Sequence, residues 1–85
     1  MAEVVIVEQL FEQPLSDEEH SRLGKRLDSC VELRNGRWMR SYLSSDHLRM
    51  ICEFEAPDAQ SIRDAYGAAG VTVQTVWTSE LYKRE

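Results

Sequence analysis

The side chains of this sequence that could do acid–base or metal chemistry are few and widely separated. Glu8 interrupts an apolar run, either as a buried carboxylate that pairs with Arg40 or as an edge-of-core glutamate that an arginine satisfies. The two histidines, His20 and His47, could bind a metal ion as a pair, but a helix-surface histidine and a turn histidine are usually solvated. The sequence has no glycine-rich phosphate loop, nucleophile elbow or H-E-x-x-H motif.

The two cysteines, Cys30 and Cys52, lack the CxxC spacing of structural zinc sites and would form at most one disulfide. We expect both to be free and reduced, as in a cytoplasmic protein. Met50 and Phe54 place Cys52 on the apolar face of a strand, where burial raises the pKa of a thiol. This environment favours a packed core cysteine over a nucleophile, and the sequence therefore assigns no catalytic residue.

The charge of the chain argues against nucleic acid and membrane partners. Ten basic and 15 acidic side chains give a net charge of −5, and the aromatic signature of RNA-recognition modules is absent. The first eight residues contain no basic residue and only four consecutive apolar ones, which predicts neither a signal peptide nor a membrane span. Residues 21–50 carry seven basic and three acidic side chains. Arg37, Arg40 and Arg49 there could form an anion-binding patch or pair with flanking acids.

The 85 residues allow one domain, residues 1–85, and its elements follow the order βαββαβ. Ser16 with Glu19 forms a capping box at the start of the first helix, and Asp58 caps the second. We expect strands at 4–12, 37–44, 47–56 and 71–78, and apolar helix stripes of Leu23, Leu27, Cys30 and Val31 and of Ala59, Ile62, Ala65, Tyr66 and Ala69. Right-handed crossovers then give an α+β, ferredoxin-like fold: a four-stranded antiparallel sheet with both helices on one face.

A hairpin with a two-residue turn, Ser45-Asp46, joins the two middle strands. This register pairs Tyr42 with Arg49, Arg40 with Ile51 and Trp38 with Glu53, on the sheet face that no helix covers. We expect Met39, Ser41, Leu43, Leu48, Met50, Cys52 and Phe54 on the face toward the helices. A second subunit would cover the mixed aromatic and charged face, giving a homodimer of the dimeric α/β-barrel type. A ligand could lie between the two sheets or between sheet and helices of one subunit.

Residues 37–42 (RWMRSY), residues 52–58 (CEFEAPD) and Ile62-Arg63 resemble a small bacterial family that is catalogued as a domain of unknown function. Some of its members are labelled nickel-binding proteins, and the resemblance extends from the first strand to Trp77. It implies a ferredoxin-like fold, a dimer, and nickel or another divalent metal as a ligand. The second helix of the family often carries a histidine where this chain has Tyr66, a poorer nickel ligand, so no metal ligand is assigned.

Three functions remain open on this sequence. The leading hypothesis is a non-enzymatic, homodimeric binding protein for a small molecule or a divalent metal. Its alternatives are a cofactor-independent monooxygenase or isomerase of the dimeric α/β-barrel type, and a purely structural dimerisation module. An enzyme needs an enclosed titratable group, a metal site needs at least about three converging donors, and a structural module needs no cavity. The candidate binding residues are Glu8, Trp38, Arg40, Tyr42 and Glu53.

Overall fold

Six elements follow one another in the computed structural model, which describes residues 2–73 and 75–84. They are β1 (Glu3–Leu10), α1 (Asp17–Glu32), β2 (Arg37–Leu43), β3 (Arg49–Ala56), α2 (Ala59–Ala68) and β4 (Thr75–Ser79). The four strands form one antiparallel sheet in the order β2-β3-β1-β4. This arrangement confirms the predicted ferredoxin-like fold.

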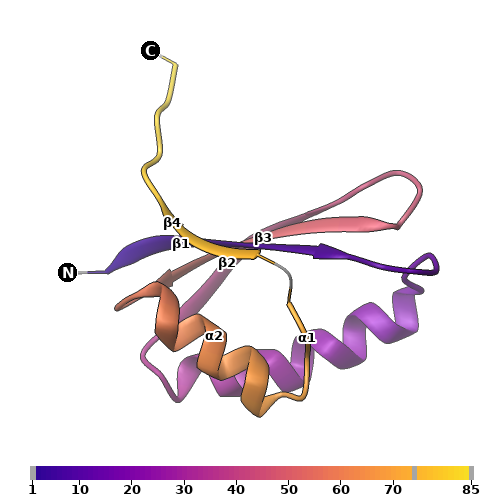
Figure 1. Ribbon diagram of the computed structural model, residues 1–85, viewed down its shortest axis with the longest axis horizontal. Coiled ribbons are helices and arrows are strands. Elements are labelled where there is room, and N and C mark those ends of the chain that lie inside the picture. Colours follow the sequence, from indigo (N-terminus) through magenta and orange to yellow (C-terminus); the bar gives the residue numbers. More distant parts are fainter. Residues whose placement is uncertain (1, 74, 85) are drawn as a thin grey trace.

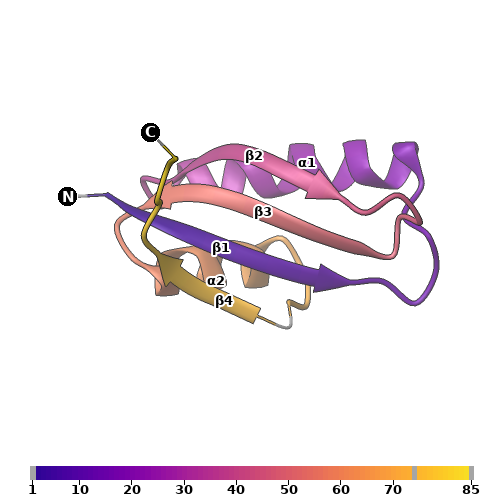
Figure 2. The same cartoon turned by 90° about the horizontal axis from the view of Figure 1, so that it is seen from above.

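Both helices lie on the same side of the sheet (Figure 1), and viewed from the other side the four strands lie in front of them (Figure 2). Right-handed crossovers produce this asymmetry, because each βαβ unit returns its helix to the same face. The segment after β4 leaves the sheet on the side away from the helices (Figure 1). None of the described helices is long and apolar enough to cross a membrane.

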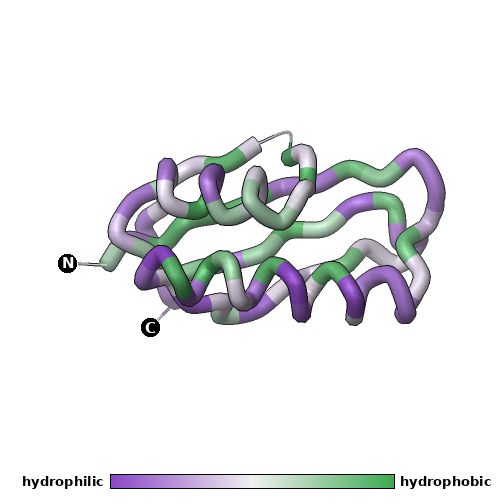
Figure 3. The backbone as a smooth tube through the Cα atoms, turned by 90° about the horizontal axis from the view of Figure 1, so that it is seen from below, coloured by the Kyte–Doolittle hydropathy of each residue, from purple (hydrophilic) through white to green (hydrophobic). Residues whose placement is uncertain are grey.

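The helix α1 begins at the predicted cap. The hydroxyl of Ser16 accepts a hydrogen bond from the Glu19 backbone N–H at 3.1 Å and donates one to the Glu19 carboxylate at 3.0 Å. Leu27 and Val31 are the buried residues of this helix. Hydrophobic positions alternate with hydrophilic ones along it (Figure 3), as in a helix that rests one face on a sheet.

The shorter helix α2 begins at Asp58, which accepts hydrogen bonds from the backbone N–H and the hydroxyl of Ser61. These hydrogen bonds lower the pKa of the Asp58 carboxyl. The helix buries Ile62, Ala65 and Tyr66 against the sheet. Small side chains around Tyr66 allow the helix to approach closely, and the Tyr66 ring meets the Phe54 ring edge-on at a centroid distance of 5.9 Å.

The predicted two-residue hairpin turn is wrong. Ser44 pairs with Arg49 through a backbone hydrogen bond of 2.9 Å, so four residues, 45–48, form the loop. The Asp46 carboxylate holds this longer loop, because it accepts hydrogen bonds from the Ser44 hydroxyl and the Leu48 N–H. The cross-strand pairs of β2 and β3 therefore shift by two residues from the predicted register, and Tyr42 lies opposite Ile51 instead of Arg49. A shift of two leaves each side chain on its predicted face.

A β-bulge in β2 overturns the predicted position of Trp38. Trp38 pairs with Phe54 and Arg40 pairs with Glu53, which leaves Met39 as an extra residue. The bulge moves Trp38 to the face toward the helices, although the strict alternation of a strand predicts it beside Arg40. At the other edge, β4 starts at Thr75 instead of residue 71, and residue 74 of the predicted strand lies outside the described residues.

The turn after α1 depends on Gly36. A methyl group there would lie 2.8 Å from Cγ1 and 3.2 Å from the carbonyl oxygen of Val31. We therefore expect Gly36→Ala to lower the free energy of unfolding by about 1–3 kcal/mol, measured by urea denaturation. Gly67→Ala is the matched control, because a methyl group on this helix residue meets nothing within 4 Å. The control should raise stability by about 0.5–1 kcal/mol, and equal effects of the two variants would contradict the contact.

Candidate functional site

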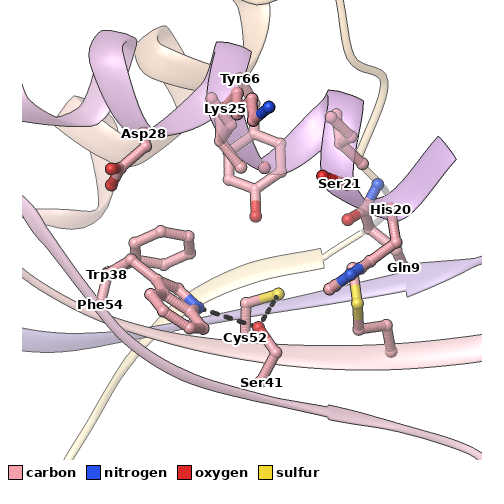
Figure 4. Close-up of a pocket in the computed structure, with 14 residues that line it drawn as sticks. Gln9, His20, Ser21, Lys25, Asp28, Trp38, Ser41, Cys52, Phe54 and Tyr66 are labelled. Carbon is pink, nitrogen blue, oxygen red and sulfur yellow. Dashed lines mark hydrogen bonds between the residues drawn. The ribbon is translucent and has the colours of Figure 1, made fainter. Parts of the chain in front are cut away.

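A pocket of about 420 Å³ lies between α1 and the sheet, on the covered face (Figure 4). The volume is within the range of about 300–1,000 Å³ that small-molecule sites occupy. Helix α1 forms one side, strands β1, β2 and β3 form the floor, and Tyr66 reaches in from α2. Its lining is Gln9, His20, Ser21, Leu23, Gly24, Lys25, Leu27, Asp28, Trp38, Ser41, Met50, Cys52, Phe54 and Tyr66.

A short hydrogen-bond chain crosses the pocket floor (Figure 4). The indole Nε1–H of Trp38 donates to the Ser41 hydroxyl at 2.9 Å, and that hydroxyl donates to Cys52 Sγ at 2.9 Å. The β-bulge makes this chain possible, because it brings Trp38 to the same face as Ser41 and Cys52. The hydrogen bond fixes the orientation of the indole, which is still 50% exposed. Trp38 is therefore an oriented aromatic wall at the edge of the pocket.

Two side-chain oxygens of the residues that line the pocket are buried and form no well-aligned hydrogen bond among the described residues. They are Oε1 of Gln9 and the hydroxyl of Tyr66. The Tyr66 hydroxyl lies beside the Cys52 thiol, which is a weak acceptor. Gln9 is only 5% exposed and Tyr66 is fully buried. The phenol of Tyr66 points from α2 toward Cys52 and the pocket floor (Figure 4). An unpaired buried polar atom costs about 1–3 kcal/mol, and folded proteins rarely retain one without a use.

The titratable groups enclosed in the pocket stay neutral. Burial raises the pKa of the Cys52 thiol, and the hydroxyls of Ser41 and Tyr66 beside it offset part of this rise. Burial and the neighbouring Cys52 also raise the pKa of the Tyr66 phenol far above neutral pH. The charged residues of the lining, Lys25 and Asp28, are exposed on α1 at the mouth of the pocket. The floor therefore offers hydrogen bonds without a net charge.

The structure does not bring all five predicted binding residues together. Trp38 lines the pocket, whereas Glu8, Arg40, Tyr42 and Glu53 lie on the opposite face of the sheet. Nε of Arg40 lies 3.5 Å from Oε2 of Glu53, and Glu8 pairs in the sheet with residues 51 and 75.

The arginines of the predicted anion-binding patch also meet acids. Nη2 of Arg37 lies 2.6 Å from Oε1 of Glu55, beside the pair that Arg40 forms with Glu53. Two of the three candidate arginines therefore pair with carboxylates of β3, as the alternative interpretation of the basic segment expects. Exposed pairs of this kind contribute little to stability, but they neutralise the patch.

Sequence reasoning missed Gln9 and Tyr66 as site residues because it looked for charged groups. A signal was present for Gln9, since it follows Val5 and Val7 in the row of β1 that faces the helices. A polar residue in a buried row needs a partner, and its position predicts a polar contact inside the fold. Tyr66 was recognised as part of an apolar helix stripe and as the position where the resembled family often has a histidine, but not as a binding residue.

The described residues contain no group of three or more histidine, cysteine, aspartate and glutamate side chains that could hold a metal ion. His20 lines the pocket from α1, while Nδ1 of His47 lies 2.8 Å from the Leu15 carbonyl oxygen. This hydrogen bond ties the hairpin loop to the segment before α1. His47 thus has a structural contact in the loop.

Comparisons with known proteins identify relatives of this fold. Residues 5–78 match the family described as nickel responsive protein SCO4226-like. The crystal structure of SCO4226 from Streptomyces coelicolor A3(2) superposes with a TM-score of 0.84 and covers 94% of this chain and 99% of that chain. At 10% sequence identity this likeness shows a shared fold. No curated protein matches the chain.

The raised pKa of the Cys52 thiol predicts slow alkylation. The raised pKa leaves less of the reactive thiolate at alkaline pH, so Cys52 should react more slowly than a thiol with an ordinary pKa. We expect iodoacetamide to modify the half-buried Cys30 first at pH 8, with Cys52 at least about tenfold slower, as measured by peptide mass spectrometry. Both should react equally in urea. Faster alkylation of Cys52 in the folded protein would refute this assignment.

Proposed function

This chain belongs to the nickel-responsive, SCO4226-like family, and we propose that it is a small cytoplasmic binding protein whose ligand occupies the pocket between α1 and the sheet. One observation carries the proposal: the residues that line the pocket bury two side-chain oxygens, on Gln9 and Tyr66, without a well-aligned hydrogen bond in the described part of the chain. A ligand that hydrogen-bonds to them recovers the free energy lost when they were buried. The free thiols of both cysteines suit a reducing compartment.

The same geometry favours binding over catalysis. General acid–base catalysis needs an enclosed group whose pKa lies near the working pH. Burial raises the pKa of both enclosed titratable groups, the Cys52 thiol and the Tyr66 phenol, so neither exchanges protons readily at neutral pH. The cavity itself weighs against a purely structural module, which would have no need of one.

Trp38 provides the test of this pocket. With indole as the probe, we expect an NMR titration to shift resonances of residues that line the pocket, and Trp38→Ala to weaken binding about tenfold through loss of ring contact. Tyr82→Ala is the control, because Tyr82 is an aromatic residue beyond β4 that is 85% exposed and does not line the pocket. It should leave the affinity unchanged. Shifts that map to the opposite face of the sheet would refute the proposed site.

We further propose that a second copy of the chain covers the open face of the sheet. Apolar and aromatic side chains lie there among charged ones, with Tyr42 58% and Trp77 42% exposed. Ile6 and Ile51 lie between them, and the pair of Arg40 with Glu53 borders them. Aromatic anchors with a polar rim are typical of protein interfaces. Two sheets packed face to face would form the dimeric α/β-barrel arrangement.

Native mass spectrometry of untagged protein tests this interface. We expect a dimer for the wild type and a monomer for Trp77→Glu, since a buried, unpaired carboxylate at the interface costs several kcal/mol. Leu33→Glu is the control, because Leu33 is 80% exposed at the end of α1 on the helix side. It should remain a dimer. A monomeric wild type at micromolar concentration would rule out the interface.

The family description favours nickel as a second candidate ligand. The residues of one subunit do not fit this metal, because no three suitable donors converge among those described and Tyr66 is buried with a raised pKa. A nickel site would therefore need donors from both subunits. The same mass spectra, taken before and after adding nickel, decide this point. Stoichiometric nickel on the dimer would support the metal, and a dimer that takes up none at tens of micromolar free nickel would remove it.

A further inference from the structure

We infer that the pocket ligand is a small, neutral, planar molecule that carries a hydrogen-bond donor and a separate hydrogen-bond acceptor, as aromatic amides do. This inference rests on the proposed function of the pocket and specifies the chemistry of its ligand. It is drawn from the two unpaired polar atoms, from the charge of the pocket floor and from the shape of its walls.

The unpaired atoms define the polar groups of the ligand. Oε1 of Gln9 carries no hydrogen, so only a donor such as an N–H can satisfy it. The Tyr66 phenol remains protonated and can donate its hydrogen to an acceptor such as a carbonyl oxygen. The Ser41 hydroxyl already accepts from Trp38 and donates to Cys52, so it is not the main polar contact for a ligand.

The pocket floor selects against charged ligands. Its polar residues are Gln9, Ser41, Cys52 and Tyr66, and all four are neutral in the structure. The only fully charged lining residues, Lys25 and Asp28, have opposite signs and stand exposed at the mouth. A carboxylate placed on the floor would lose its hydration without a cation to replace it. A neutral amide loses much less hydration free energy than a carboxylate does, and it gains two hydrogen bonds on the pocket floor.

The walls favour a flat molecule. Trp38 presents an indole ring whose orientation is held by the hydrogen bond from its Nε1 to Ser41. The Phe54 ring lies nearby on the floor, and its edge-on contact with Tyr66 restrains it. Rings packed against a planar ligand bury area with little loss of side-chain freedom, because both are already oriented.

Two matched pairs of probes test the donor and the acceptor separately. Indole and indene differ mainly in an N–H donor, and 1-indanone and indane differ in a carbonyl acceptor. We expect NMR titration of the wild-type protein to give each polar probe at least about a tenfold lower Kd than its hydrocarbon partner. Tyr66→Phe should abolish the preference for 1-indanone and keep the preference for indole. Gln9→Met should do the reverse.

Urea denaturation checks that the Tyr66 variant is still folded. Tyr66→Phe removes a buried hydroxyl whose polar neighbour, the Cys52 thiol, is a weak acceptor, so the urea midpoint of this variant should change little. Benzamide and benzoate test the charge: benzoate should bind at least about tenfold more weakly than benzamide.

The outcomes separate this inference from the proposed function. If hydrocarbons bind as tightly as their polar partners, or if neither variant alters a preference, the pocket still binds small molecules but the ligand chemistry inferred here is wrong. Tighter binding of benzoate than of benzamide would overturn it as well. If none of the probes shifts a pocket resonance at millimolar concentration, both the ligand class and the binding function fail.

Discussion

The alternation of side chains along β3 determines which residues of the sheet face the pocket and which face the open side. β3 pairs with β2 on one side and with β1 on the other, so its two rows set the faces of the sheet. The row buried beneath the helices is Met50, Cys52, Phe54 and Ala56. The row on the open face is only half buried and contains Ile51, Glu53 and Glu55. Because the period of a strand is two residues, a slip of one residue would exchange a hydrophobic row for a charged one.

The cavity exists because α1 does not fill the space above this buried row. Two helices share the covered face, and α2 fills its part with Ile62, Ala65 and Tyr66. Over the pocket, α1 presents Ser21 and Gly24, and a methyl group added to Gly24 would touch nothing within 4 Å. The pocket is therefore a property of the helix sequence as well as of the fold.

Much of the fold follows from the sequence, because capping residues and a two-residue period leave clear patterns. The start of α1 at Ser16 and the inward row of β3 were predictable for this reason. The hairpin length was not, since the Asp46 side chain can hold either a short turn or the observed loop. The bulge at Met39 carries no glycine or proline to mark it. The candidate site was missed for the same reason, because the bulge places Trp38 on the sheet face that carries the neutral groups of the pocket floor.

The bulge has a spectroscopic consequence. Without it, both tryptophans would lie on the open face of the sheet; with it, Trp38 and Trp77 lie on opposite faces. Indole emission depends on the immediate surroundings of each ring, and the Trp38 ring donates a hydrogen bond to a hydroxyl that itself contacts a sulfur. The two tryptophans thus lie on opposite faces of the sheet and on its two edge strands, β2 and β4. Variants that keep one indole each would report independently on the covered face and on the open one.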